Sequence, residues 1–230
     1  MTDSSQVDAQ RFAVIFDMDG LMLNSEPIYR LACVTAASAL GCSVTDELYH
    51  QLLGRTEADS EGILQTYFEG RLDVNAFRRL WSENFSAAVE RSGMERKDGL
   101  DDLLDALDAR SILYAVATST GRERARHSLA AAGLLDRFST VVFGDEVRNG
   151  KPDPEIFLTA ATRLGVDPSL CIVLEDSDAG ILAAARAGMR PIMVPDLKAP
   201  SEEAARAAVV IARSLREVTP FVLAMLDDAV

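Results

Sequence analysis

Short, continuous runs of hydrophobic residues alternate with longer amphipathic stretches over most of the chain. The clearest hydrophobic runs lie at residues 12–16, 112–118, 140–143 and 170–174, with weaker ones at 191–194 and 209–211. Runs of this length without polar interruption are typical of parallel strands that are buried on both faces of a sheet. The intervening stretches with helical spacing lie at residues 100–109, 122–132, 154–164 and 180–187. Strands that alternate with helices predict a doubly wound, parallel α/β sheet.

The predicted helices carry recognisable end signals. Gly133, Gly165 and Gly188 follow three of them, and glycine is the residue that most often ends a helix. Ser214 and Glu217 have the spacing of a capping box, so we expect a final helix to begin there.

One interval interrupts the alternation of strands and helices. The first strand ends near residue 16, but the next strand-and-helix pattern starts only near residue 99, and a connection of this length has to be structured. Its sequence is helical in four segments, at residues 26–40, 45–53, 59–68 and 74–91. We therefore predict a small all-helical domain at residues 25–95, inserted into an α/β core made of residues 1–24 and 96–230.

The charge of the chain narrows the choice of partners. The formal net charge is −13 over 230 residues, which disfavours binding to nucleic acid or to an anionic membrane. No hydrophobic run reaches the length of a membrane span. A phosphorylated small molecule would also be repelled, so local cations or a metal ion must provide the attraction at any phosphate site.

Cysteine and histidine are too few for several kinds of site. The chain has three cysteines, Cys33, Cys42 and Cys171, and no C-x-x-C pair. An odd number without such a pair argues against a disulfide framework and against a zinc cluster, and it favours a reducing cytoplasm. His50 and His127 are the only histidines and lie far apart in the sequence. A histidine-rich metal centre is excluded, and a Ser-His-Asp hydrolase is disfavoured.

Acidic pairs follow two of the predicted strands. Asp17 and Asp19 come directly after the first strand, and Glu175 and Asp176 come directly after the strand at residues 170–174. Carboxylates held close together are costly unless a cation or proton compensates them, and magnesium prefers oxygen ligands. The alternative interpretation is structural: aspartates of a surface turn for the first pair, and helix capping for the second.

Two further strand ends carry groups that bind phosphate. Thr118 and Ser119 precede a helix, where hydroxyls and free backbone N–H groups bind anions, although such residues more often cap the helix. Lys151 stands between the third strand and the following helix, where an ordinary lysine would be a solvated charge. The strand ends together supply a nucleophile, an acid/base, metal ligands and a cation, which is the set that phosphoryl transfer needs.

Four ordered segments carry a family resemblance: FDMDGLMLNSE, AVATST, GKPDPEIF and VLEDSDAGI. In order and spacing, from residue 12 to the C-terminus, the chain resembles the haloacid dehalogenase superfamily, in the branch whose helical cap follows the first strand. Phosphatases and β-phosphoglucomutase-like proteins belong to that branch. The resemblance implies a Rossmann-like core, a helical cap domain and Mg²⁺ as cofactor. Asn24 departs from the aspartate that is common among relatives, at the cap hinge.

The resemblance also implies roles for individual residues. Asp17 would attack phosphorus, and Asp19 would protonate the leaving oxygen and then activate water. Thr118 and Lys151 would hold the phosphoryl oxygens. The metal ligands would be Asp17, the backbone carbonyl of Asp19, Glu175 and Asp176. Further contacts to the phosphate or the rest of the substrate fall on Met18, Ser119, Glu26, Gly54, Arg55 and Thr56.

Several functions are compatible with these motifs. We predict a phosphatase that releases phosphate from a small phosphorylated metabolite, such as a sugar phosphate, and that acts as a monomer or weak dimer. Asp19 argues against a dehalogenase, whose reaction needs neither a metal nor an acid at that position. A phosphomutase is the main alternative, but the cap loop has Leu53 and Glu57 where β-phosphoglucomutase has a lysine and an arginine. A non-enzymatic phosphate-binding module is the remaining alternative.

Overall fold

The computed structural model describes residues 12–52 and 57–227, and a parallel sheet of six strands forms the centre of this part of the chain. The strands are β1 (Ala13–Phe16), β2 (Leu113–Ala117), β3 (Val141–Val142), β4 (Cys171–Glu175), β5 (Arg190–Met193) and β6 (Val210–Ile211). Their order in the sheet is β3-β2-β1-β4-β5-β6, so β1 lies between β2 and β4.

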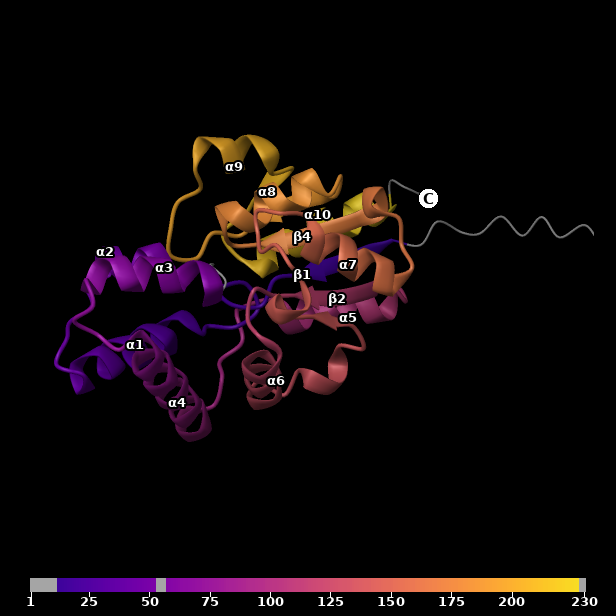
Figure 1. Cartoon of the computed structure of the whole chain (residues 1–230). Coiled ribbons are helices and arrows are strands. Elements are labelled where there is room, and N and C mark those ends of the chain that lie inside the picture. The colour runs from indigo at the N-terminus through magenta and orange to yellow at the C-terminus, as the bar shows by residue number, and fades with distance from the viewer. Residues whose placement is uncertain (1–11, 53–56, 228–230) are drawn as a thin grey trace, which may run out of the picture.

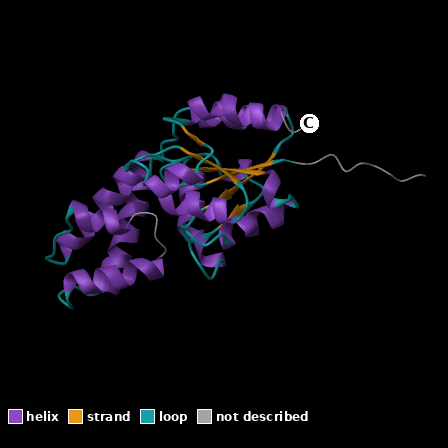
Figure 2. Ribbon diagram, turned by 90° about the horizontal axis from the view of Figure 1, so that it is seen from above, coloured by secondary structure: helices purple, strands orange, loops and turns teal. Residues whose placement is uncertain are grey.

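Helices cover both faces of the sheet (Figure 2). Those that follow β1 in the α/β core are α5 (Leu100–Ala109), α6 (Arg122–Ala131), α7 (Glu155–Leu164), α8 (Asp178–Arg186), α9 (Glu202–Ala207) and α10 (Leu215–Asp227). Short 3-10 turns occur at η1 (Leu135–Arg137), η2 (Gly144–Glu146) and η3 (Pro168–Leu170).

Side chains of β1 alternate between two hydrophobic cores. Val14 and Phe16 pack in the cluster that holds the buried side chains of α5, α6 and α10, whereas Ala13 and Ile15 pack with those of α7 and α8. Successive residues of a strand point to opposite faces, so a strand covered on both sides must be hydrophobic throughout. The predicted doubly wound α/β fold is confirmed, and all six predicted strands are present to within a residue or two.

Two local features differ from the sequence analysis. Helix α9 has no counterpart among the predicted helices, because its six residues, rich in alanine and glutamate, show no clear hydrophobic period. The predicted capping box is only half formed: the Glu217 N–H donates to Ser214 Oγ at 3.4 Å, but the Glu217 carboxylate accepts from Arg213 N–H at 3.0 Å instead of from Ser214.

Four helices connect β1 to α5 and lie on one side of the core, at the left of Figure 1. They are α1 (Glu26–Ala39), α2 (Asp46–Leu52), α3 (Glu57–Phe68) and α4 (Val74–Ser92). Cys33, Tyr49 and Phe77 are among the buried residues of a separate hydrophobic cluster inside this group. Phe85 and Val89 of α4 instead join the cluster of the main core, so α4 attaches the helical group to the sheet layers. The division at residues 25–95 stays a prediction.

The described helices include no segment that is both long and hydrophobic enough to cross a membrane.

We expect Leu104→Ala to lower the free energy of unfolding by about 2–5 kcal/mol, because Leu104 is fully buried under the sheet and its truncation leaves a cavity. Leu158→Ala makes the same chemical change at a position that is 37% exposed and is the matched control. Urea unfolding followed by circular dichroism measures both variants. Equal effects at the two positions would contradict the packing described here.

Candidate active site

Three neighbouring strands end at the same level of the sheet. Phe16 of β1 pairs with Val116 of β2 and with Leu174 of β4, and the Asp17 N–H donates to the Leu174 carbonyl at 3.0 Å. The residues that follow these strand ends therefore converge on one edge, where open α/β sheets bind their ligands.

Asp17 and Lys151 form a buried ion pair at this edge. Lys151 Nζ lies 2.5 Å from Asp17 Oδ1 and 2.6 Å from Glu175 Oε1, and it also donates to the Ala117 carbonyl at 3.1 Å. The exposed fractions of the side chains are 3% for Lys151, 9% for Asp17 and 1% for Glu175. Lys151 is thus a buried cation and not the solvated lysine of the alternative interpretation.

The electrostatics of the site follow from burial and from an excess of carboxylates. Burial disfavours the charged ammonium, but the carboxylates of Asp17 and Glu175 outweigh that effect and hold the pKa of Lys151 above its ordinary value. Burial, followed by the nearby charge of Glu175, raises the pKa of Asp17, while Lys151 acts in the opposite direction. The single positive charge of Lys151 does not neutralise the negative charges of the carboxylates around it.

Asp19 is held by two hydroxyl groups that the sequence interpretation missed. Ser25 Oγ donates to Asp19 Oδ1 and Thr120 Oγ1 donates to Asp19 Oδ2, each at 2.7 Å. Thr120 lies in the same TSTG segment as Thr118, and Ser25 directly precedes α1, but neither position signalled a partner for Asp19. The two bonds fix the orientation of a carboxylate that lines the cavity.

Asp176 lies against the turn that follows β1. Gly20 has a φ of +84°, and a Cβ atom there would stand 2.4 Å from Asp176 Oδ2, so only glycine allows this approach. No described residue donates a hydrogen bond to the Asp176 carboxylate. Burial and the charges of Glu175 and Asp17 raise its pKa well above the ordinary value.

These acids fit a magnesium ion. In the described part of the chain, no three acidic, histidine or cysteine side chains form a complete metal cage. Magnesium does not need one, because it usually keeps several waters and is bound by one or two carboxylates together with a substrate phosphate. Asp17 and Asp176 can supply those carboxylates, and a cation would offset the negative charge that raises their pKa values.

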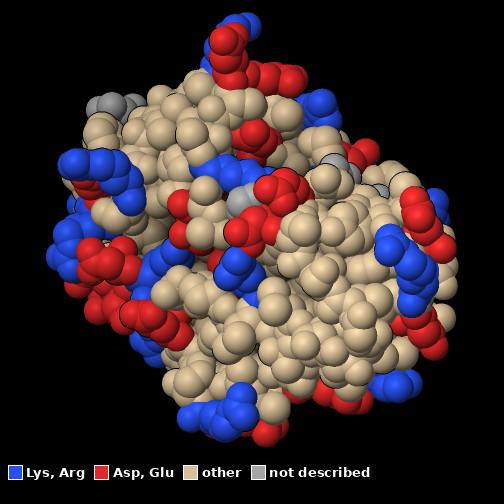
Figure 3. Space-filling view, turned by 90° about the vertical axis from the view of Figure 1, so that its left-hand side faces the viewer, with Lys and Arg blue, Asp and Glu red and all other residues tan. Residues whose placement is uncertain are grey.

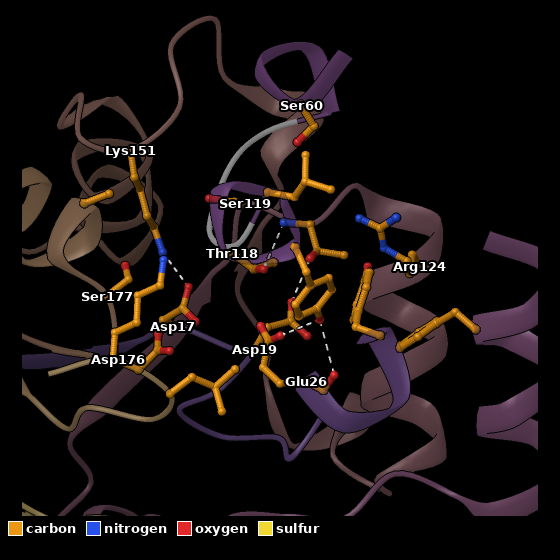
Figure 4. A pocket seen from close by; sticks show the side chains of 18 of the residues that line it. Asp17, Asp19, Glu26, Ser60, Thr118, Ser119, Arg124, Lys151, Asp176 and Ser177 are labelled. Carbon is orange, nitrogen blue, oxygen red and sulfur yellow. Dashed lines mark hydrogen bonds and ion pairs between the residues drawn. The ribbon is translucent and has the colours of Figure 1, made fainter. Parts of the chain in front are cut away.

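The acids open into a cavity of about 550 Å³ between the α/β core and the helical group. Asp17, Lys151 and Asp176 lie at one side and Arg124 lies at the other (Figure 4). Glu26 and Tyr49 line the helical side, where Tyr49 Oη donates to Glu26 Oε2 at 2.8 Å. Burial raises the pKa of Glu26 to about 7. Acidic and basic side chains lie next to one another near the centre of the face seen in Figure 3.

Most of the predicted site residues meet in this cavity, including Thr118 and Ser119. Met18 differs, because its side chain is fully buried in the main hydrophobic cluster and does not line the cavity. Gly54, Arg55 and Thr56 lie outside the described residues, as does the side chain of Glu57. Sequence reasoning did not find Tyr49 and Arg124, because nothing in the local sequence places them at the cavity.

A parallel α/β sheet with a carboxylate-rich site at its strand ends and helices inserted after the first strand defines a class of hydrolases. Residues 14–194 match the family of haloacid dehalogenase-like hydrolases, and the chain belongs to this family. The resemblance seen in the four sequence segments is confirmed, and so is the predicted enzyme class, a phosphoric monoester hydrolase of this superfamily.

Similar proteins include two curated phosphatases. The phosphorylated carbohydrates phosphatase of Thermotoga maritima is 36% identical over 78% of this chain and 83% of its own length. The validoxylamine A 7'-phosphate phosphatase of Streptomyces hygroscopicus is 33% identical over 76% of this chain and 81% of its own length. The crystal structure of CbbY from Rhodobacter sphaeroides in complex with phosphate has a TM-score of 0.79 and 28% identity, covering 91% of this chain and 96% of that chain.

Proposed function

We propose that the protein is a magnesium-dependent phosphatase that hydrolyses a small phosphorylated metabolite through an aspartyl-phosphate on Asp17. The observation that carries this proposal is the buried contact between Asp17 and Lys151 at the floor of a cavity that also holds Asp19 and Asp176. The cavity volume of about 550 Å³ suits a small metabolite. The names of the similar phosphatases favour a phosphorylated carbohydrate or a related monoester.

In this proposal Asp17 attacks phosphorus. Lys151 binds Oδ1 of its carboxylate, and no described residue binds Oδ2, which remains available as the nucleophilic oxygen. Attack forms a bond from this oxygen to phosphorus while the ester P–O bond breaks. Thr118 and Lys151 would contact the phosphoryl oxygens, together with Ser119 and the main chain near Met18. Lys151 already uses its three hydrogens, so it must exchange one contact when the phosphoryl group binds.

Asp19 would move the proton in both halves of the reaction. It would give a proton to the departing alkoxide and then take one from the water that attacks the aspartyl-phosphate. Release of inorganic phosphate returns Asp17 to its carboxylate form. The hydroxyls of Ser25 and Thr120 hold Asp19 in one orientation for both steps.

The magnesium ion would be held by the carboxylates of Asp17 and Asp176 and by the backbone carbonyl of Asp19. The resemblance adds Glu175 to this set. When bound, the ion neutralises negative charge on the phosphoryl group and on the acids around it.

The helical group would select the substrate. Glu26 and Tyr49 present a hydrogen-bonded pair to the cavity, and such a pair suits the hydroxyl groups of a sugar. Gly54, Arg55 and Thr56 of the cap loop belong to the same proposal. Residues 25–95 would act as a cap over the core of residues 1–24 and 96–230, and closure would exclude bulk water during the first step.

The free thiols of Cys33, Cys42 and Cys171 support a reducing compartment such as the cytoplasm.

A mutase would need a cationic anchor for a second phosphate, and Glu57 stands where β-phosphoglucomutase has an arginine. We therefore expect the enzyme to release inorganic phosphate and not to move phosphate between positions of glucose phosphate. The measurement incubates the enzyme with β-glucose 1-phosphate and a bisphosphate primer and follows glucose 6-phosphate and free phosphate together. Rapid formation of glucose 6-phosphate with little free phosphate would reverse the assignment. A panel of phosphorylated metabolites then identifies the preferred ester.

A further inference from the structure

Two chain segments connect the helical group to the α/β core, and hydrogen bonds join one to the other. The first is the turn after β1, at residues 17–25, which carries Asp19. The second is the return segment, at residues 93–99, between α4 and α5. The Lys97 N–H of the return segment donates to the Met22 carbonyl of the turn at 2.9 Å. The return segment therefore lies directly against the turn that carries Asp19.

The side chain of Lys97 reaches the loop that follows β5. Lys97 Nζ lies 2.6 Å from Asp196 Oδ1, and the exposed fractions of the two side chains are 25% and 15%. The second oxygen, Asp196 Oδ2, is buried and receives no hydrogen bond from a described residue. A Cβ atom on Gly20 would stand 3.4 Å from this oxygen. Asp196 thus lies next to the residue that directly follows Asp19, and Lys97 holds it there.

We propose that Lys97 and Asp196 are positioning residues for Asp19. Their ion pair holds the turn that carries Asp19 between the return segment and the loop after β5. This proposal rests on the proposed phosphatase function, in which Asp19 is the acid/base.

The part of the turn next to Asp19 has little packing of its own. Asp19 faces the cavity, and Gly20 has a φ of +84° and no side chain. The position of these two residues therefore depends on their neighbours, and Asp196 is one of them. The rest of the turn is held by side chains that are buried in the main hydrophobic cluster, namely Met18, Leu21, Met22 and Leu23.

Each member of the ion pair needs the other in order to stay in place. Asp176 Oδ2 also lies beside Gly20, so without Lys97 two carboxylates would repel each other across the glycine. An uncompensated, largely buried charge is costly, and Asp196 would then turn toward water. Without the Asp196 carboxylate, the Lys97 ammonium would turn toward water for the same reason. Loss of either charge therefore frees the turn on the side of Asp196.

Two variants remove the pair by opposite changes of charge. Lys97→Met removes a cation and Asp196→Asn removes an anion, so a purely electrostatic effect on the site would have opposite signs in the two. Lys97→Arg keeps the charge. Asp98→Asn is the matched control, because Asp98 lies in the same return segment and pairs with Arg216 at 2.8 Å, but its side chain is 68% exposed. Exposed ion pairs contribute little.

The choice of ester separates the positioning of Asp19 from a general loss of structure. An alkoxide needs a proton as it leaves, whereas p-nitrophenolate is a stable anion and gains little from an acid. We compare kcat/KM for p-nitrophenyl phosphate with kcat/KM for glucose 6-phosphate or, where that is not hydrolysed, for the preferred alkyl ester of the metabolite panel. This ratio reports the formation of the phosphoenzyme, in which Asp19 is the acid. Circular dichroism reports folding.

We expect Lys97→Met and Asp196→Asn each to lower kcat/KM about 10–100-fold for the alkyl ester and no more than about threefold for p-nitrophenyl phosphate. Lys97→Arg and Asp98→Asn should stay within about threefold of the wild type for both esters. The double variant should lose no more than either single variant, because residues that act as a unit are not additive. Effects of opposite sign in the two single variants, or equal losses on both esters, would overturn the proposal.

Hydrogen exchange followed by NMR tests the same contact without turnover. We expect the main-chain amides of the turn and of Lys97 to exchange at least about tenfold faster in Lys97→Met and Asp196→Asn, and at wild-type rates in Asp98→Asn. Unchanged exchange in the first two variants would contradict the proposal. If the wild type hydrolyses no phosphate ester at all, the proposed function fails, and exchange alone then decides whether the ion pair holds the turn. The amides followed are those of Gly20, Met22, Leu23, Asn24 and Lys97.

Discussion

Asp17→Asn is expected to lower phosphatase turnover by at least about 10³-fold and to abolish the covalent phosphoenzyme, because a neutral amide is a poor nucleophile. Asp17 is the residue that Lys151 contacts at 2.5 Å, and its second carboxylate oxygen has no partner among the described residues. Steady-state release of phosphate and mass spectrometry of the acid-quenched enzyme measure the two effects.

Two other variants are compared with Asp17→Asn. Asp136→Asn makes the same change at an exposed position and should leave turnover unchanged. Asp19→Asn keeps the nucleophile and removes the acid/base, which typically costs about 10²–10⁴-fold. Wild-type turnover in Asp17→Asn, with a native circular dichroism spectrum, would mean that another residue attacks phosphorus.

Removal of divalent metal is expected to abolish turnover, and addition of magnesium should restore it. Asp17 and Glu175 contact the buried Lys151, and Asp176 lies close by, so the site carries an excess of negative charge into which a phosphate dianion must enter. Treatment with a chelator followed by dialysis, and then titration with MgCl₂, measures the effect through phosphate release.

Thermal unfolding provides the control for this experiment. A ligand that binds only the folded state raises the midpoint of unfolding, so magnesium should stabilise the wild type and should stabilise Asp176→Asn less. Full activity in a metal-stripped sample would disprove the magnesium mechanism.

Local sequence was enough to predict the strands of the sheet and their burial between two layers of helices. A run such as residues 13–16 has no polar face, so it can be buried only between two layers of helices. Helix α9 could not be predicted in the same way, because its six residues carry too little hydrophobic pattern to distinguish a helix from a loop.

The convergence of Asp17, Thr118 and Asp176 was also determined by the sequence alone. Each follows a hydrophobic strand, and the carboxyl ends of parallel strands meet at one edge of a sheet. Only the tertiary structure decided the partners of each group. Thr120 reaches Asp19 across 101 residues of sequence, which no local pattern encodes. Glu175 faces Lys151 while its neighbour Asp176 faces Gly20, because the space above Gly180 and the donors of Ser177 accept one carboxylate and not the other.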